Sequence, residues 1–178
     1  KDANQWVKTF KVMSKGADGS WTDVDGGKTY TGNTDRDTQV DVTFDTPVDA
    51  RYIRIYPQSW QGHMSMRADI YAAAAEATPT PLRDTPESMR SASTVWSGQA
   101  IGVGHGRGRL DSVQGWSAQH NRVGEWYQLD NGFVGKITGV AIKGRKDANQ
   151  WVKTFKVMSK GADGSWTDVD GGKTYTGN

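Results

Sequence analysis

The sequence predicts an all-β sandwich with long loops at its ends. Short runs rich in β-branched and aromatic residues alternate between apolar and polar positions, as half-buried strands do. Gly, Asp and Asn residues separate these runs at turn positions. No stretch of comparable length shows the periodicity of an amphipathic helix. These three observations together favour an all-β architecture.

The expected strands cover residues 39–44, 51–56, 66–71, 125–129, 137–142, 152–158 and 166–169. Asp163-Gly164, between the last two, predicts a hairpin because this dipeptide adopts the positive φ angles of tight β-turns, and the signal recurs at Asp18-Gly19. The largest loops are expected at residues 33–38, 59–63, 96–109 and 144–151. Binding groups on rigid sandwiches usually lie in such loops.

An internal repeat dominates the organisation of the chain. Residues 1–33 return letter for letter as residues 146–178. The two copies begin 145 residues apart. This period is close to the roughly 100–150 residues of one domain, so the repeated unit is a domain plus a linker. Residues 72–89 carry three of the five prolines and no apolar periodicity, which is typical of an interdomain spacer. We therefore expect residues 1–71 to be the C-terminal part of one domain and residues 90–178 the N-terminal part of the next.

A complete domain reads in circularly shifted order: residues 90–145, one copy of the repeat, then residues 34–71. One copy is therefore surplus. A tandem array of identical domains, exchange of segments between chains, or a permuted chain with two competing copies would each explain it. The spacer favours the array, because it is unlike a Gly/Ser linker. The sequence decides neither between these arrangements nor which copy completes the fold.

Composition excludes several functions. The chain has no cysteine, so it can build neither a disulfide nor a thiolate metal site. Its formal net charge is +2 with both signs interspersed, which argues against a nucleic-acid partner. No apolar stretch approaches the roughly 20 residues of a membrane span, and no signal peptide begins at Lys1. Eight tryptophans would suit either a core or a sugar-facing surface.

Several short blocks carry a family resemblance when they are taken in the shifted order. They are Gly108-Arg-Leu-Asp-Ser112, Gly115-Trp-Ser-Ala118, Gly124-Glu-Trp-Tyr-Gln-Leu-Asp130, Gly144-Arg-Lys-Asp147, Phe155-Lys-Val157, Asp18-Gly-Ser-Trp21, Gly32-Asn-Thr-Asp35, Ala50-Arg-Tyr-Ile-Arg-Ile-Tyr-Pro57 and Met66-Arg-Ala-Asp69. Outside the linker, the chain resembles the discoidin domain, also called the coagulation factor 5/8 C-type domain. It is most similar to the tandem discoidin domains of echinoderm adhesion proteins.

The resemblance implies a galactose-binding-like, jelly-roll β-sandwich with ligand loops at one end. It also implies a secreted, extracellular protein that binds glycans, collagen or phospholipid. Many members join their termini by a disulfide, and this chain has Ala and Ser there instead. Catalysis finds little support, since no metalloprotease or nucleophile-elbow motif is present and the glycine-rich residues 102–109 do not open a helix.

Sugar binding needs an aromatic face together with charged or amide groups that bond hydroxyls. The predicted loops supply this mixture as Trp96, His105, Arg107, Asp147, Gln150, Trp151, Asp35, Arg36, Trp60 and His63. Trp116, Trp126 and Trp166 lie in strand-like blocks and are expected to be structural. Arg67 and Arg109, beside strands, are expected in buried ion pairs rather than at the ligand.

A calcium ion is a separate hypothesis for the loop at residues 33–38. Asp35 and Asp37 offer the hard oxygen ligands that calcium prefers. Two aspartates in a polar loop are, however, more often turn formers. Calcium is also found near the ligand end in some members of the family that the chain resembles.

The leading interpretation is a non-enzymatic extracellular adhesion module that binds glycan or matrix through its loops, with tandem display raising avidity. One alternative is a structural unit that assembles with neighbouring copies of itself by strand exchange. The other is binding to membrane phospholipid through apolar loop tips, for which Val95, Trp96, Ile101 and Val103 are available. The sequence does not identify the sugar.

Overall fold

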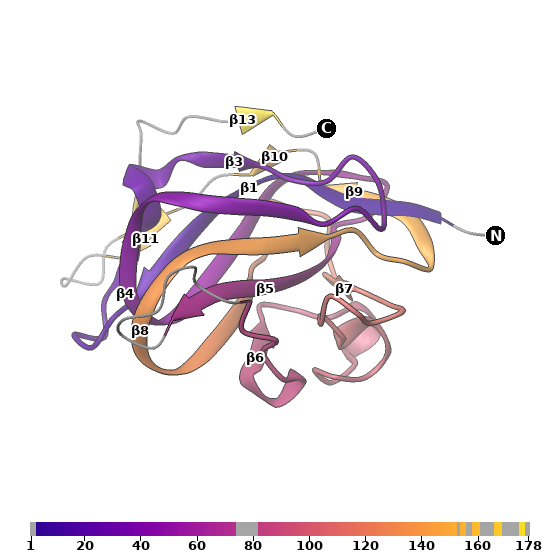
Figure 1. Ribbon diagram of the computed structural model, residues 1–178. Coiled ribbons are helices and arrows are strands. Elements are labelled where there is room, and N and C mark those ends of the chain that lie inside the picture. Colours follow the sequence, from indigo (N-terminus) through magenta and orange to yellow (C-terminus); the bar gives the residue numbers. More distant parts are fainter. Residues whose placement is uncertain are drawn as a thin grey trace.

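The computed structural model describes residues 3–73 and 82–152, and the short strands 154–155, 158–160, 166–168 and 175–176; from residue 148 onward only the backbone is described. The strands are β1 (Ala3–Lys15), β2 (Trp21–Asp23), β3 (Thr29–Thr31), β4 (Val40–Gln61), β5 (Ser65–Ala73), β6 (Arg90–Ala92), β7 (Trp116–Ser117), β8 (Tyr127–Lys143), β9 (Ala148–Val152), β10 (Thr154–Phe155), β11 (Met158–Lys160), β12 (Trp166–Asp168) and β13 (Tyr175–Thr176). The predicted all-β class is confirmed (Figure 1).

Helical structure in the described ranges is limited to four 3-10 turns, η1 (Val24–Gly27), η2 (Glu87–Met89), η3 (Trp96–Gly98) and η4 (Gly104–Gly106). No helix in these ranges is long and apolar enough to span a bilayer.

Two long antiparallel strands, β4 and β8, run through both layers of the sandwich. Their ladder is continuous except for shifts between Thr43 and Val48 and between Ala50 and Tyr52, where the pair bends (Figure 1). Pro47 lies in the first gap, where it removes no ladder hydrogen bond. The four strands expected at residues 39–44, 51–56, 125–129 and 137–142 are therefore two, because the chain bends at these positions and the strands continue.

The remaining strands complete the layers on either side of this bend. The C-terminal part of β8 pairs with β5, which in turn pairs with β7. The N-terminal part of β8 pairs with β6. The second half of β4 pairs with β1, which carries β2 and β3 on its other edge. The turn at Asp18-Gly19 joins β1 to β2 as predicted, with Gly19 at a φ of 79°.

Aromatic side chains fill the core between the layers. Trp116 stacks on Tyr127 at 5.3 Å, and both are fully buried. Phe10 and Phe44 pack on either side of Tyr30. The structural role expected for Trp116 is thus confirmed. Trp126 is half-buried against the Arg54 guanidinium, 4.0 Å away, and the side chain of Trp166 lies outside the described residues.

The first copy of the repeat occupies the sandwich. Its strand β1 pairs with β4 from Trp6 to Lys15, and its apolar residues are buried in the core. The second copy adds strands around it: β9 pairs with the start of β1 and with the end of β4, and β11 extends the sheet beyond β2. Of the strand expected at residues 152–158, the described positions 152, 154–155 and 158 belong to β9, β10 and β11, and the others lie outside the described residues.

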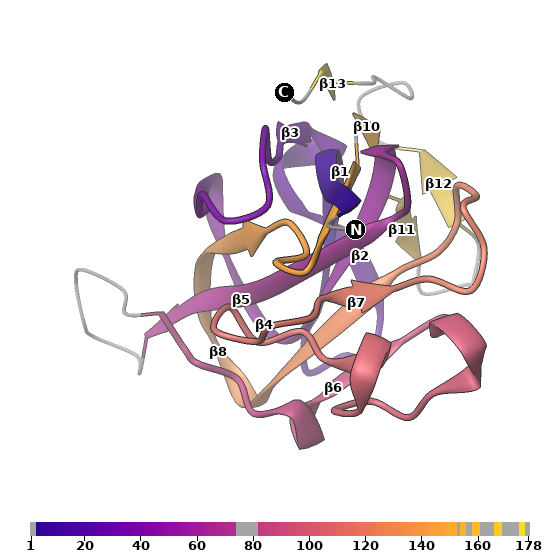
Figure 2. The same ribbon diagram turned by 90° about the vertical axis from the view of Figure 1, so that its right-hand side faces the viewer.

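Residues 3–73 and 82–147 pack into this one sandwich. The assignment of residues 1–71 and 90–178 to successive domains, with residues 72–89 as linker, stays a prediction. Loops gather at the end of the sandwich where β1 begins, and Figure 2 looks onto this end, where η3, η4 and the segment after β8 surround the start of β1.

Candidate functional site: a pocket at the loop end

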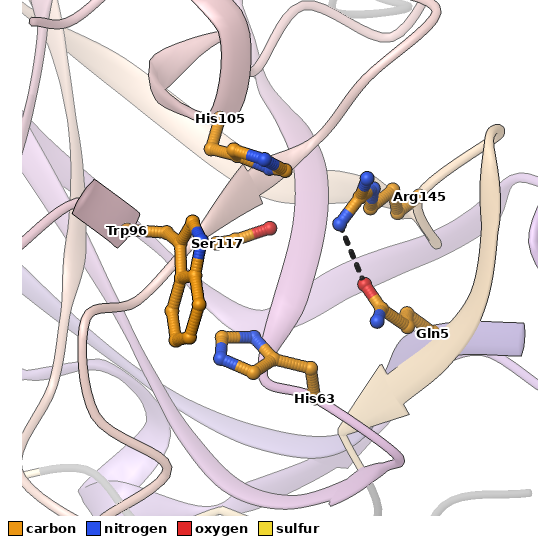
Figure 3. A pocket seen from close by; sticks show the side chains of 6 residues that line it. All are labelled: Gln5, His63, Trp96, His105, Ser117 and Arg145. Atoms are coloured by element: carbon orange, nitrogen blue, oxygen red, sulfur yellow. Dashed lines mark hydrogen bonds between the residues drawn. The ribbon is translucent and has the colours of Figure 1, made fainter. Parts of the chain in front are cut away.

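A pocket of about 250 Å³ opens at the loop end, lined by Gln5, His63, Trp96, His105, Ser117 and Arg145 (Figure 3). Each side chain comes from a different segment: β1, the β4–β5 turn, η3, η4, β7 and the segment after β8. The pocket therefore exists only once the sandwich has closed.

Trp96 forms the aromatic wall. Its side chain is 42% exposed, and the His63 ring meets it edge-on, with centroids 5.2 Å apart. The turn that carries Trp96 is tight: Ser97 and Gly98 both have positive φ, and the Gly98 amide donates to the Val95 carbonyl at 3.0 Å. This backbone conformation holds a large apolar face at the surface.

The opposite wall is polar and ordered by Arg145. Its guanidinium donates to Oε1 of Gln5 at 3.0 Å and to both carboxylate oxygens of Asp147. Gln114 also donates to Asp147, at 3.0 Å. Burial raises the pKa of Asp147, but the hydrogen bonds from Arg145 and Gln114 outweigh it, so the pKa lies below its usual range. Arg145 is thus held at the rim by a charged partner.

Ser117 continues this network at the floor of the pocket. Its hydroxyl lies 2.8 Å from that of Ser65, and Ser65 donates to Oε1 of Gln5 at 3.3 Å. These hydroxyls and the Gln5 amide are the groups that can exchange hydrogen bonds with a sugar.

His63 and His105 face the pocket as neutral rings. Burial lowers both pKa values, and the charge of Arg145 acts in the same direction. Each Nδ1 is buried, and that of His105 has no hydrogen-bond partner among the described residues. The His105 backbone is fixed by a 2.6 Å bond from its amide to Gln99. With Nδ1 buried, each neutral imidazole can therefore present Nε2 to a ligand, as donor or acceptor according to its tautomer.

Arg67 holds the surrounding loops together from below. It is 2% exposed, and it donates to the carbonyls of Gly144 (2.8 Å), Leu110 (2.9 Å), Ser112 (3.1 Å) and Arg36 (2.8 Å) and to Oδ1 of Asp37 (3.3 Å). The buried role expected for Arg67 is confirmed. Arg109 also forms ion pairs, with Asp84 and Asp111, and lies outside the pocket lining as expected, but its side chain is half-exposed rather than buried because its segment lies at the surface.

A second hollow, of about 440 Å³, lies beside residues 93–94 and 122–125. Its buried carboxylate, Glu125, accepts hydrogen bonds from Ser93, Thr94 and Arg122. Ser93 and Thr94 lead directly into the Trp96 turn. This cluster therefore anchors the turn that carries the aromatic wall.

The structure brings three of the ten sequence-predicted site residues, His63, Trp96 and His105, into one pocket. Asp147 lies directly behind Arg145. Arg107 is exposed and bonds only weakly to the Gly102 carbonyl, at 3.4 Å, outside the pocket lining. Trp60 is half-buried and packs against the core.

Of the other four predicted residues, two are not described as side chains and two lie outside the pocket lining. The side chains of Gln150 and Trp151 are outside the described residues, whereas their counterparts in the first copy are described: Gln5 lines the pocket and Trp6 is 5% exposed. Asp35 and Arg36 pack behind the pocket, where Gly144 fits only because it has no Cβ; a Cβ there would lie 2.7 Å from the Asp35 carbonyl oxygen.

Sequence reasoning missed Gln5, Ser117 and Arg145. Gln5 had a signal, because its identical copy Gln150 was selected in a predicted loop. Ser117 and Arg145 lie inside blocks that carried the family resemblance, but nothing in their spacing pointed to the pocket.

The two carboxylates expected to bind calcium have partners within the protein in this conformation. Both carboxylate oxygens of Asp35 accept hydrogen bonds, from the amides of Asp37 and Thr38 and from the Thr38 hydroxyl. Burial raises the pKa of Asp35, but these bonds outweigh it and lower the pKa. Asp37 pairs with Arg67. No group of three or more potential metal-ligating side chains occurs in the described ranges. Calcium binding stays a prediction for a titration to decide.

Comparison with known proteins agrees with the geometry. The F5/8 type C domain model matches residues 1–70 and 90–178. Mouse lactadherin is 30% identical over 194 aligned positions, covering 98% of this chain and 42% of that protein. A discoidin-1 chain of Dictyostelium discoideum is 32% identical over 112 positions, covering 63% of this chain and 41% of that protein.

A human protein named EGF-like repeat and discoidin I-like domain-containing protein 3 is 23% identical over 92% of this chain and 38% of its own length. The chain thus spans about two fifths of each of these relatives. No solved structure matches it significantly. Because the family model matches residues 1–70 and 90–178, the chain belongs to the F5/8 type C, or discoidin, domain family.

Proposed function

We propose that this protein is a non-enzymatic, extracellular adhesion module that binds glycans through the loop-end pocket. The observation that carries the proposal is the pairing of an exposed indole face, Trp96, with a polar wall of Gln5, Ser117 and Arg145. A sugar ring has an apolar face and a rim of hydroxyls, and these two walls match both.

Binding rather than catalysis is supported by the bonding of the pocket groups. The Ser117 hydroxyl bonds Ser65 and the Gly115 carbonyl, so it is not aligned on a histidine base. Arg145 is already paired with Asp147, which favours a positioning role over a chemical one.

Tandem display would strengthen such binding. A single shallow sugar site is weak, but linked sites act at high effective concentration and raise avidity without new contacts. The duplicated segment supports an arrangement of repeated domains. An array of glycans should then retain a multi-domain protein much longer than a single domain, and equal retention would argue against avidity.

The direct test is Trp96→Ala measured on a glycan array and by calorimetry with the sugars that bind. We expect loss of binding with only a modest fall in melting temperature, because Trp96 is 42% exposed. Val123→Ala is the matched control, since Val123 is 62% exposed and lies outside this pocket. Unchanged glycan binding by Trp96→Ala would refute the proposed site.

Phospholipid binding is the second candidate, favoured by exposed apolar side chains on the same end. Trp96 is 42% and Val103 56% exposed, whereas Val95 and Ile101 pack against the core. Of the four apolar residues proposed at the loop tips, only Trp96 and Val103 are therefore exposed enough to enter a membrane interface. Val103→Ser should weaken binding to phosphatidylserine vesicles under this hypothesis and leave glycan binding unchanged.

Self-assembly is supported by the strands that the second copy adds to the sheet. β11 pairs with β2 and lengthens the sheet at its edge. If neighbouring chains used this edge, the mass measured by light scattering would rise with concentration. A constant monomer mass would exclude it as the main role.

A further inference from the structure

The first copy of the repeat fills one place in the sandwich, and we call the place that residues 3–33 occupy the slot. Within it, β1 pairs with β4, while β2 and β3 pair with the other edge of β1. The segment ends at Asn33, which is fully buried and donates through Nδ2 to the carbonyls of Thr38 (2.7 Å) and Ile142 (3.1 Å). The slot therefore holds a complete structural unit that runs from β1 to the buried side-chain amide of Asn33.

The second copy contains every side chain that this slot requires. Residues 1–33 and 146–178 are identical, so the identity extends from β1 through the anchor, with Asn178 as the counterpart of Asn33. The pocket residue Gln5 has its counterpart in Gln150. Replacing one copy by the other would change neither the core nor the pocket chemistry.

The second copy already pairs in the register of the first. On β4, Trp6 is opposite Gln61 and Val7 opposite Trp60. The equivalent residues of β9, Trp151 and Val152, are opposite the same Gln61 and Trp60.

The two copies also lie side by side without offset. β1 and β9 run parallel with identical residues paired, from Ala3 with Ala148 to Trp6 with Trp151. β9 is thus placed at the entrance of the slot, beside the strand that it would replace.

The internal pairings of the second copy repeat those of the first as well. Lys160 is opposite Trp166 as Lys15 is opposite Trp21, and Phe155 is opposite Tyr175 as Phe10 is opposite Tyr30. These pairings exist outside the slot, so they need not be formed anew on entry.

The two copies diverge immediately after Asp147. Arg145 donates its amide to the Gln5 carbonyl at 2.8 Å, and its side chain binds Asp147. Residues up to 147 can hold the same place in either arrangement, so the exchange moves the backbone beyond them and the first copy that they displace.

We propose that residues 146–178 are an alternative occupant of this slot within the same chain, so that either Gln5 or Gln150 completes the pocket. The two arrangements bury the same side chains in the same register, and they differ only in chain connectivity. Exchange would proceed by strand displacement from β9 along β4, with the departing copy leaving from the same end.

Disulfide trapping tests the exchange in the full chain, which has no cysteine of its own. In the described arrangement Lys160 is opposite Trp21, Trp21 opposite Lys15, and Lys15 opposite Tyr52. Lys160 is therefore three strand spacings, about 14 Å, from Tyr52, too far for a disulfide. After exchange, Lys160 takes the place of Lys15.

The test variant is Tyr52→Cys with Lys160→Cys, and the matched control is Tyr52→Cys with Lys15→Cys. We expect both to form a disulfide within one chain, seen as a fast-migrating monomer on a non-reducing gel. A control that cross-links while the test variant does not would overturn the proposal. Cross-linking of the test variant only between chains would also overturn it, because exchange would then require a second molecule.

A second measurement compares Phe10→Ala, Phe155→Ala and the double variant by thermal unfolding. Phe10 is fully buried, so replacing the phenylalanine of whichever copy occupies the slot by alanine should lower the melting temperature by about 10 °C or more. With interchangeable copies, each single variant melts near the wild type, and only the double variant shows the full loss. If Phe10→Ala alone melts as low as the double variant while Phe155→Ala is unchanged, the second copy cannot enter the slot.

Discussion

Replacement of Arg67 by methionine tests whether one buried guanidinium organises the loop end. Methionine keeps much of the apolar volume but removes the charge and every donor, leaving the carbonyls of Gly144, Leu110, Ser112 and Arg36 without this partner. Leaving a buried acceptor without its hydrogen bond costs about 1–3 kcal/mol, so the loss of a donor by four carbonyls should together cost about 3–5 kcal/mol. For a chain of this size that corresponds to a fall in melting temperature of about 6–20 °C.

The assay is urea unfolding followed by tryptophan fluorescence, with thermal melting as a second probe. Arg51→Met is the matched control, because Arg51 forms a two-pronged pair with Asp130 but its side chain is 44% exposed. Exposed pairs contribute little to stability, so this variant should unfold near the wild type. Equal, small losses in both variants would refute the role assigned to Arg67.

Local geometry leads to three more predictions. Gly108→Ala should abolish stable folding, because a Cβ there would lie 1.9 Å from the buried Tyr127 hydroxyl; a soluble variant with native melting would contradict this. Asp69→Asn should cost about 3–5 kcal/mol in urea unfolding, because it removes the buried carboxylate that pairs with Arg90 and leaves only that of Glu87, 3.9 Å from the Arg90 guanidinium. Stability should also fall as pH drops below about 6.5, because the lowered pKa values of His63 and His105 let the unfolded chain bind protons that the folded chain refuses. His63→Gln should reduce the slope of the unfolding free energy against pH between about pH 8 and 5. An unchanged slope would show that His63 does not cause the effect.

Local sequence signals were sufficient for the architecture. Alternating apolar residues in β1, β4, β5 and β8 and the Asp18-Gly19 turn are visible in the sequence, because side-chain burial and turn geometry depend on near neighbours. The continuity of β4 and β8 was not visible. Residues 44–50 carry turn-forming Asp45 and Pro47, but pairing across the bend keeps the backbone extended.

The site was predictable only in part, because it is assembled from six separate segments. Trp96, His63 and His105 were predicted correctly as pocket residues because aromatic and imidazole side chains in predicted loops are uncommon and suit sugar binding. Arg145 was missed because its role depends on Gln5, which is 140 positions away in sequence. The repeat added a second difficulty: the right amide was recognised as Gln150, but no local pattern distinguishes it from Gln5.

Glycan binding at the loop end is tested most directly by a sugar titration followed by two-dimensional NMR of the tryptophan indole and histidine ring signals. With galactose- and fucose-type sugars, the glycan-binding proposal predicts saturable shifts of Trp96, His63 and His105, while the buried Trp116 indole stays unmoved. Saturable binding whose shifts map away from these three rings, or no binding by any sugar tested, would contradict it.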